Sequence, residues 1–288
     1  MQHIAILCAL QQEITPFIRH IPALQEMEWP GIARLWQGQH AGKTLTLVLS
    51  GIGKVHAAAA AQSVITHYAP DAVFSCGTAG SLDDQYQIGD IVVGQQTVQH
   101  DYGFVLPETF LPFTFRLLTK TKTPKFLKEF PADETLLNAA HQRESQWTPR
   151  SQVFYSTIVT GDQVIFSSAK RQALAQQFHA TAVDMESAAI AQVCLLNHIP
   201  FLSIRGISDH ADETIPIDTS HIDPNEFVSY ASASVGEKFS LLTKAVMYFS
   251  QHPSEFVLSV QARQHMKLAA QNSAVFTLTL FHELPANS

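Results

Sequence analysis

Residues 45–80, LTLVLSGIGKVHAAAAAQSVITHYAPDAVFSCGTAG, contain the segment that decides the fold. In order, it holds an apolar run, a glycine turn, an alanine-rich run and a second apolar run: Leu45–Ser50, Gly51-Ile52-Gly53, His56–His67 and Ala72–Cys76. Short apolar runs bounded by glycine are typical of buried strands, and the long run between them is typical of a helix. The segment therefore predicts a strand–helix–strand unit.

The same alternation continues on both sides of this segment. Further strands are predicted at His3–Leu10, Asp90–Gly94, Gln152–Thr160, Ala182–Val183 and Pro200–Ile207. Further helices are predicted from about Gln12, near Thr135–His141, over Ser168–Gln177 and Ser187–Leu196, and over Pro224–Phe249, whose start is marked by Asp223, Pro224 and Glu226. Strands that are apolar along their length lie between two layers of helices. We therefore predict an α/β fold, a single three-layer domain with a central, mostly parallel (mixed) twisted sheet flanked by helices.

The composition of the chain argues against several classes of protein. The net charge is −7 at pH 7, which does not suit a protein that binds nucleic acid. Cys8, Cys76 and Cys194 lie in apolar runs without a CxxC motif, which predicts buried, reduced thiols in a cytoplasmic protein. We see no signal-peptide pattern and no apolar run long enough to span a membrane. The 14 histidines show no metal-ligand spacing, so we predict no metal and no cofactor.

Polar and acidic residues follow the predicted strands, at the point where each strand ends. In sheets of this kind, ligands bind beyond the carboxyl ends of the strands. The residues at these ends are Glu13, Ser50-Gly51-Ile52-Gly53, Gly77-Thr78-Ala79-Gly80, Thr160-Gly161-Asp162, Asp184-Met185-Glu186 and Ser208-Asp209. We therefore expect Glu13, Glu186 and Asp209 to meet at one rim of the sheet, among glycines that let a ligand approach the backbone.

Each of these acids also has an ordinary structural explanation. Glu13 suits the first turn of a helix, and Asp209 suits a turn with Ser208. Asp184 and Glu186 suit the positive end of the next helix. Taken singly, each acid is better explained in this way. Three acids at neighbouring strand ends, taken together, favour a site.

Three carboxylates without a metal suit the cleavage of a glycosidic bond. The transition state of this reaction resembles an oxocarbenium ion and carries positive charge on the sugar. One carboxylate would activate water, a second would bind the sugar hydroxyls, and a third, kept protonated by burial, would protonate the leaving group. The glycine turn at residues 51–56 lacks the third glycine of a dinucleotide motif, and the chain has no P-loop and no nucleophile elbow.

Six segments of the chain resemble the nucleoside phosphorylase/nucleosidase superfamily. In order, they are AILCALQQEI, LSGIGKVHAAAAAQ, CGTAGSLDDQYQIGDIVV, VTGDQVI, AVDMESAAIAQVC and PFLSIRGISDHAD, and they cover roughly residues 1–100 and 155–250. The set is most similar to the 5′-methylthioadenosine/S-adenosylhomocysteine nucleosidases. The resemblance implies a homodimer that hydrolyses the N-glycosidic bond of a small-molecule nucleoside substrate and releases adenine.

The resemblance also implies a role for each acid. Glu13 resembles the residue that activates the water, and Glu186 resembles the residue that grips the ribose 2′- and 3′-hydroxyls. Asp209 resembles the acid that protonates N7 of adenine, oriented by Ser208. Asp184 is implied to be a supporting group.

Other positions match the substrate-binding residues of the family. Met185 is implied to pack on the sugar, and Ile52 and Thr78 are implied to line the water and ribose region. The backbone around Ile165 matches the segment that hydrogen-bonds the base. Val164 stands where the bacterial enzymes commonly carry the phenylalanine that stacks on adenine, which is a departure from the family.

The resemblance divides the chain into regions. Residues 1–250 are predicted to be a nucleoside phosphorylase-like catalytic domain, with an inserted loop region at about 102–150 that does not align with the family. Residues 251–288 are predicted to be a C-terminal extension that packs on the surface. It would hold one helix and then an edge strand at Val275–Phe281, where apolar residues alternate.

Three other functions stay open from the sequence. A phosphorylase of the same superfamily would hold phosphate with arginine, but Ser75 stands where such relatives usually carry that arginine, and Arg205 is a poor substitute. A futalosine-type hydrolase is compatible with the altered base pocket at Val164. A non-catalytic nucleoside-binding protein would have no use for the three carboxylates.

Overall fold

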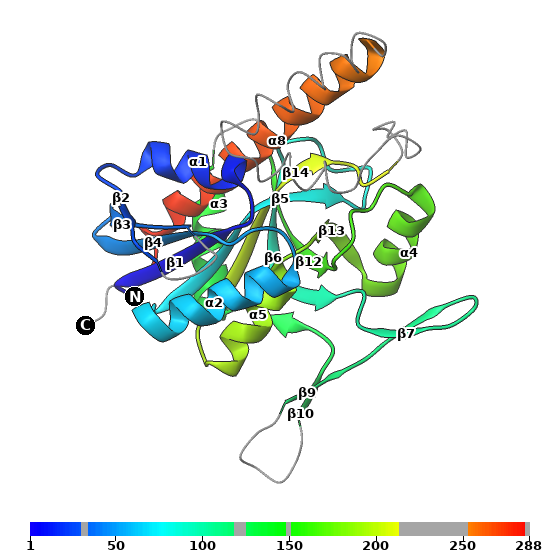
Figure 1. Ribbon diagram of the computed structural model, residues 1–288, viewed down its shortest axis with the longest axis horizontal. Helices are drawn as coiled ribbons and strands as arrows, with labels where there is room; N and C mark the ends of the chain where they lie inside the picture. The colour runs from blue at the N-terminus through cyan, green and yellow to red at the C-terminus, as the bar shows by residue number, and fades with distance from the viewer. Residues whose placement is uncertain (30–33, 118–124, 148–150, 213–252, 286–288) are drawn as a thin grey trace.

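The computed structural model describes residues 1–29, 34–117, 125–147, 151–212 and 253–285 of the chain. A mixed β-sheet lies at its centre, with helices packed against it (Figure 1). The predicted strand–helix–strand unit is confirmed and consists of β4 (Lys43–Leu49), α2 (Lys54–Tyr68) and β5 (Ala72–Ser81). Both strands of this unit pair in parallel with β1 (His3–Cys8), so this part of the sheet is parallel, as predicted.

The main sheet has ten strands in the part of the chain that the structure describes. Its other members are β2 (Gln25–Met27), β3 (Arg34–His40), β6 (Ile91–Gln99), β11 (Phe130–Pro131), β12 (Val153–Thr160), β13 (Ala180–Asp184) and β14 (Phe201–Asp209). Each predicted strand up to residue 207 has a counterpart here. The edge strands β2 and β3 were missed because β2 is exposed along its length and Gly38 interrupts β3.

Five of these strands close into a barrel. β14 pairs in parallel with β5 on one side and antiparallel with β6 on the other. From β6 the pairing continues to β12 and to β13, which returns to β5 at Gly80 and Ser81. The predicted mixed central sheet flanked by helices is therefore present, but this part of it is closed into a barrel, which the sequence did not predict. Closure is possible because β5 extends beyond its predicted end at Cys76, and its last residues pair with β13.

Two groups of helices cover the two faces of the sheet, as predicted. α1 (Gln11–His20), α3 (Glu134–Glu144) and α8 (Pro253–Leu280) share a core with Ile4 and Ile6 of β1. α2 and α5 (Ser187–Leu196) share the opposite core with Ala5 and Leu7 of the same strand. The division follows from the strand's geometry, because successive side chains point to opposite faces. The remaining helix, α4 (Ser168–Phe178), packs against β12 and β13.

The C-terminal segment differs from its prediction in two ways. The edge strand predicted at Val275–Phe281 is wrong, because α8 continues through these residues to Leu280. The prediction that this segment packs on the surface is also wrong, since Ala270, Ala274 and Phe276 are fully buried. The apolar residues near the end of this segment alternate as in a strand. Over the longer span of α8, the buried residues recur every three or four positions, which is the spacing of a helix.

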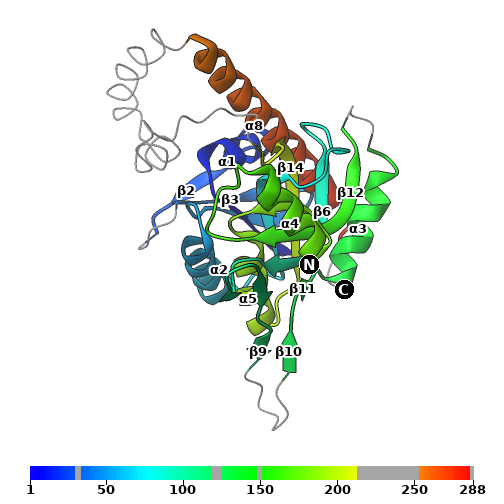
Figure 2. The same ribbon diagram turned by 90° about the vertical axis from the view of Figure 1, so that its right-hand side faces the viewer.

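The described residues of the inserted loop region, 102–117 and 125–147, contain more regular structure than the irregular insert that was predicted. They form two hairpins that extend from the body (Figures 1 and 2), followed by α3, which confirms the helix predicted near Thr135–His141. The hairpins are β7–β8 (Gly103–Val105 and Phe110–Pro112) and β9–β10 (Phe115–Leu117 and Lys125–Leu127). The helix predicted over Pro224–Phe249 lies outside the described residues. None of the helices in the described residues is long and apolar enough to cross a membrane.

Candidate active site

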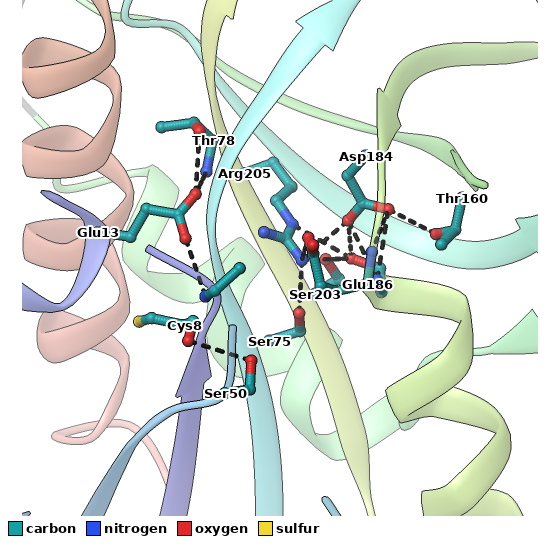
Figure 3. A network of polar contacts seen from close by, with 12 residues as sticks. Cys8, Glu13, Ser50, Ser75, Thr78, Thr160, Asp184, Glu186, Ser203 and Arg205 are labelled. Carbon is teal, nitrogen blue, oxygen red and sulfur yellow. Dashed lines mark hydrogen bonds and ion pairs between the residues drawn. The ribbon is translucent and has the colours of Figure 1, made fainter. Parts of the chain in front are cut away.

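The carboxyl ends of several strands bring acidic side chains to one rim around Arg205. Figure 3 shows Glu13 on one side of this arginine and Asp184 with Glu186 on the other. Asp209 ends β14 and approaches Gly80, three positions along β5 from Gly77, where Glu13 lies. Three strand residues span about 10 Å. Asp209 therefore lies farther along β5 than Glu13, and no described contact joins it to Glu13 or Glu186, so its place in one site with them stays a prediction.

Glu13 is held by four hydrogen-bond donors. Its Oε2 accepts bonds of 3.0 Å from the backbone N–H groups of both Ala9 and Leu10. Its Oε1 accepts bonds from Thr78, of 2.8 Å from the backbone N–H and 2.9 Å from Oγ1. The first pair is the helix-start role that the sequence suggested, but the second pair ties the carboxylate to β5. Glu13 is thus an oriented acceptor at the rim, and its side chain is only 3% exposed.

Asp184 takes over the structural role that the sequence shared between Asp184 and Glu186. Its carboxylate accepts hydrogen bonds from the backbone N–H and the hydroxyl of Ser187, and from Thr160 Oγ1 at 2.5 Å. It also pairs with Arg205, whose Nη2 lies 2.8 Å from Asp184 Oδ2. These contacts fix the start of α5 and the arginine together, which suits the supporting role implied for Asp184.

Glu186 is left free to face the rim. It is the N-cap residue of α5, yet its side chain makes no capping bond. Its Oε1 instead accepts a 2.9 Å bond from the backbone N–H of Gly53. Burial raises the pKa of Glu186 to about 8; Arg205 and the Gly53 N–H oppose this rise, and the charges of Asp184 and Glu13 add to it. Such a carboxyl is poised to ionise when positive charge develops beside it.

The sequence analysis weighed Arg205 only as a poor substitute for a phosphate-binding arginine, but the structure places it at the centre of this rim. It is 1% exposed, and its Nη2 donates to Ser75 at 2.6 Å and to Ser187 at 2.9 Å. Its Nη1 has no hydrogen-bond partner. A Cβ added to Gly77 would lie 2.5 Å from both Arg205 Nη1 and Glu13 Oε1, so the two atoms lie close together over this glycine. A donor and an acceptor placed in this way can hold a water molecule between them.

The sequence contained one signal for Arg205. It is the sole charged residue in the apolar run FLSIRGI, and a charge in a buried strand needs a partner. The structure supplies that partner from β13, which is distant in the sequence.

Ser208 and Asp209 end β14 and are fixed by local hydrogen bonds. Ser208 Oγ lies 2.8 Å from Asp209 Oδ2, where it can donate, and 3.3 Å from the carbonyl oxygen of Ala79. Asp209 Oδ1 accepts a 2.9 Å bond from the backbone N–H of Ala211. The turn expected from sequence is present, and it orients the carboxyl from both sides.

The remaining predicted substrate-binding residues differ in how near they lie to these acids. Ile52 and Met185 are half-buried and each lies next to a residue of the Gly53–Glu186 hydrogen bond. The side chain of Ile165 is buried in a cluster with Val159 and Leu174, so only its backbone can meet a ligand. Val164 is 48% exposed. No described contact joins Val164 or Ile165 to the acids.

The cysteines and the potential metal ligands contribute no further site. Cys8, Cys76 and Cys194 are free and buried, as predicted, and burial raises the pKa of each thiol. The described residues contain no group of three or more His, Cys, Asp or Glu side chains that could hold a metal ion.

Comparison with known proteins agrees with the fold. A family model described as the phosphorylase superfamily matches residues 3–246. The chain belongs to the phosphorylase superfamily. One superfamily relative, the 5′-methylthioadenosine/S-adenosylhomocysteine nucleosidase of Staphylococcus epidermidis, is 32% identical over 244 residues, which are 84% of this chain and 100% of that protein.

Solved structures of the superfamily match almost the whole chain. The nucleosidase of the same name from Neisseria meningitidis, in complex with methylthio-immucillin-A, is 27% identical with a TM-score of 0.73. That match covers 99% of this chain and 100% of the other. The futalosine hydrolase of Helicobacter pylori is 25% identical with a TM-score of 0.70, and the match covers 98% of each chain.

Proposed function

We propose that this chain is a nucleosidase that hydrolyses 5′-methylthioadenosine and S-adenosylhomocysteine, and releases adenine. The proposal is supported by its superfamily membership and by the relatives that carry this name. The single observation that carries the chemistry is the pair formed by Glu13 and the unpartnered N–H of Arg205 over Gly77.

In the first part of the mechanism, Glu13 and Arg205 hold the attacking water. Arg205 Nη1 donates to the water oxygen, and the water donates a proton to Glu13. As the water attacks the anomeric carbon, Glu13 takes this proton as a general base. The four donors around Glu13 keep the carboxylate in one orientation, so that a bond from water would add to, or replace, one of them at a fixed place.

Glu186 and Asp209 act on the two halves of the bond that breaks. In its ionised form, Glu186 binds the ribose hydroxyls, and its negative charge stabilises the oxocarbenium-like sugar. Asp209, oriented by Ser208, gives its proton to N7 of adenine, so the base leaves as a neutral molecule. Ile52, Thr78, Met185, Val164 and the backbone of Ile165 would form the surrounding substrate pocket.

The surroundings of Arg205 favour water over phosphate as the nucleophile. Its charge is offset by Asp184 at 2.8 Å, and Glu186 lies 4.0 Å away. A phosphate at this rim would face Glu13 and Glu186, and the described residues place no free cation beside it, since Ser75 carries no positive charge. A hydrolase is therefore the better chemical fit than a phosphorylase.

One observation keeps futalosine as the second candidate substrate. Val164 lies at the position implied to stack on the base, and it is 48% exposed rather than an aromatic packed in place. A futalosine hydrolase is among the structures that match 98% of the chain. Both candidates use the same three acids, so the substrate and not the mechanism distinguishes them.

A panel of substrates tests the proposal. We expect free base to be released from 5′-methylthioadenosine and S-adenosylhomocysteine, with kcat/KM at least tenfold lower for futalosine and inosine, as followed by chromatography of the bases. A higher kcat/KM for futalosine would replace the proposed substrate with the second candidate. Binding of all four nucleosides without release of any base would instead indicate a non-catalytic binding protein.

We also propose that the protein is a cytoplasmic homodimer. Its three free thiols suit a reducing compartment.

The dimer would form through the two projecting hairpins. They expose Phe104, Val105 and Phe126, and a two-stranded hairpin is marginally stable alone. A second copy of the chain would cover them. Sedimentation equilibrium should report twice the chain mass of 31.8 kDa, and Val105→Asp should shift it towards the single chain.

A further inference from the structure

Three loops at the rim are joined by a cluster that touches none of the proposed catalytic acids. The cluster consists of Lys54, the first residue of α2, with Asp101, which follows β6, and Asp162, which follows β12. We call it the Lys54 clamp. Two of its side chains are only partly exposed, Lys54 at 19% and Asp101 at 17%, whereas Asp162 is 49% exposed.

Asp101 bridges the other two members of the clamp. One of its oxygens accepts a 2.5 Å bond from Lys54 Nζ, and the other accepts a 2.9 Å bond from the backbone N–H of Asp162. Asp162 in turn accepts a 2.8 Å bond from the backbone N–H of Lys54. Burial acts to raise the pKa of Asp101, but the bonds from Lys54 and Asp162 hold it below its usual value. The carboxylate therefore stays charged and the clamp stays closed near neutral pH.

The clamp lies one residue away from each side of the site. Gly53, which precedes Lys54, donates its backbone N–H to Glu186 Oε1. Gly161, which precedes Asp162, donates its N–H to the Asp184 carbonyl at 3.1 Å. The clamp is therefore linked to both sides of the site. Lys54 is bonded to Gly53, which contacts Glu186, and Asp162 is bonded to Gly161, which contacts Asp184.

The position of Gly53 depends on the clamp. Its φ of +95° favours glycine, and a Cβ there would lie 3.1 Å from Asp162 Oδ1. No side chain can therefore anchor this residue, and its N–H has to be aimed by its neighbours. Lys54 supplies that anchor through both its backbone N–H and its ammonium group.

We propose that Lys54 and Asp101 are positioning residues that hold the Gly53 N–H against Glu186. The proposal rests on the proposed nucleosidase function, because it assigns Glu186 to the ribose. Without the clamp, the glycine turn would be free to rotate its N–H away, and Glu186 would lose its one backbone donor. The carboxyl would then bind its proton more tightly, since a hydrogen bond to the charged form favours that form.

Other charges also face Glu186, and they set the background for this effect. They are Arg205 from β14, Asp184 from β13 and Glu13 from α1. None of them belongs to the clamp, so they are unchanged in variants of Lys54 and Asp101. A shift in the titration of Glu186 in such variants therefore reports on the clamp.

Two variants of opposite charge change separate positioning from long-range electrostatics. Lys54→Met removes a positive charge, and Asp101→Asn removes a negative one. If only charge mattered, the two would move the titration of Glu186 in opposite directions. If the clamp positions Gly53, both should move it to higher pH. Lys267→Met, an exposed lysine on α8, is the matched control and should move nothing.

The titration of Glu186 is measured without turnover, by urea unfolding from pH 5 to 9. Each variant is unfolded with and without Glu186→Gln, and the difference in the free energy of unfolding is followed against pH. In both clamp variants, we expect the midpoint of this difference to move upwards by about one pH unit. In the same variants, kcat/KM for 5′-methylthioadenosine at pH 7 should fall about ten- to a hundredfold, with the loss reduced at pH 9. Opposite shifts, or no shift, in the unfolding data would overturn the proposal. If the native protein hydrolyses no nucleoside, the proposed function fails, and the unfolding data still decide on the clamp.

Discussion

Two glutamates share the site but stand in different surroundings. Glu13 receives four hydrogen bonds, whereas Glu186 receives one and is buried beside Asp184. Paired carboxyl groups with unlike environments are a usual way to divide tasks in a glycosidase. Here Glu13 is assigned to the water and Glu186 to the sugar.

The role of Glu13 is tested by Glu13→Gln. The amide keeps the shape of the side chain but cannot take a proton from water, so kcat should fall about 10²- to 10⁴-fold. The equilibrium Kd for 5′-methylthioadenosine should change by less than about tenfold, because the ribose and base contacts remain. Glu28→Gln, at an exposed glutamate, is the control. Near-normal kcat in Glu13→Gln would remove Glu13 from the mechanism.

The raised pKa of Glu186 makes a prediction for stability. An unfolded glutamate has a pKa of 4.5, and burial first of all raises that of Glu186 to about 8. Between these values the folded protein holds a proton that the unfolded chain has released. Stability from this proton is complete below pH 4.5 and is lost as the pH rises through 8.

Glu186→Gln is neutral at every pH and should escape this loss. The variant should therefore gain stability relative to the native protein as the pH rises from 5 to 9, while its activity falls. Urea unfolding at several pH values measures the difference. A difference that stays constant with pH would show that Glu186 is not protonated in the folded protein.

At the scale of elements, α8 is part of the body of the protein. The superfamily match ends at residue 246, yet α8 packs against β5 and β14, the strands that carry Thr78 and Arg205. A Cβ added to Gly206 of β14 would lie 2.1 Å from the carbonyl oxygen of Ala269 in α8. Strand and helix therefore touch at the backbone, behind the site. The boundary predicted at residue 250 stays a prediction, but the segment beyond it contributes to the core.

Phe276→Ala tests the contribution of α8. Phe276 is fully buried and contacts Trp147 edge to face, so its truncation should lower the free energy of unfolding by about 3–5 kcal/mol. Leu268→Ala on the same helix is the control, since Leu268 is 47% exposed and should cost less than about 1 kcal/mol. Equal, small effects in chemical denaturation would mean that α8 is only an appended surface helix.

The scale of single elements is also where the sequence predicted best. The helix predicted over Ser187–Leu196 has the same bounds in α5, because Asp184 and Ser187 fix its start through local hydrogen bonds. The prediction for the C-terminal segment failed because its apolar residues fit a strand pattern over seven positions and a helix pattern over a longer span. Only packing against β5 and β14 decides between these patterns.

At the scale of the whole molecule, the sequence predicted the strands but not how they close. Barrel closure depends on β14 finding both β5 and β6, and no local pattern in β14 encodes two partners. The same applies to the site. Residues that follow the ends of strands, such as Glu13 and Glu186, could be predicted from their positions in the sequence. Arg205 and the Gly53 N–H could not, because their roles arise from contacts between strands and loops far apart in the sequence.

The most direct test of the central claim is adenine release from 5′-methylthioadenosine by the native protein, with phosphate from zero to millimolar concentration. If water held by Glu13 and Arg205 is the nucleophile, release should proceed without phosphate at a rate that phosphate does not raise, and the sugar product should be free methylthioribose. Release that requires phosphate and yields a sugar 1-phosphate would contradict the account, because it would demand an anion site beside Arg205.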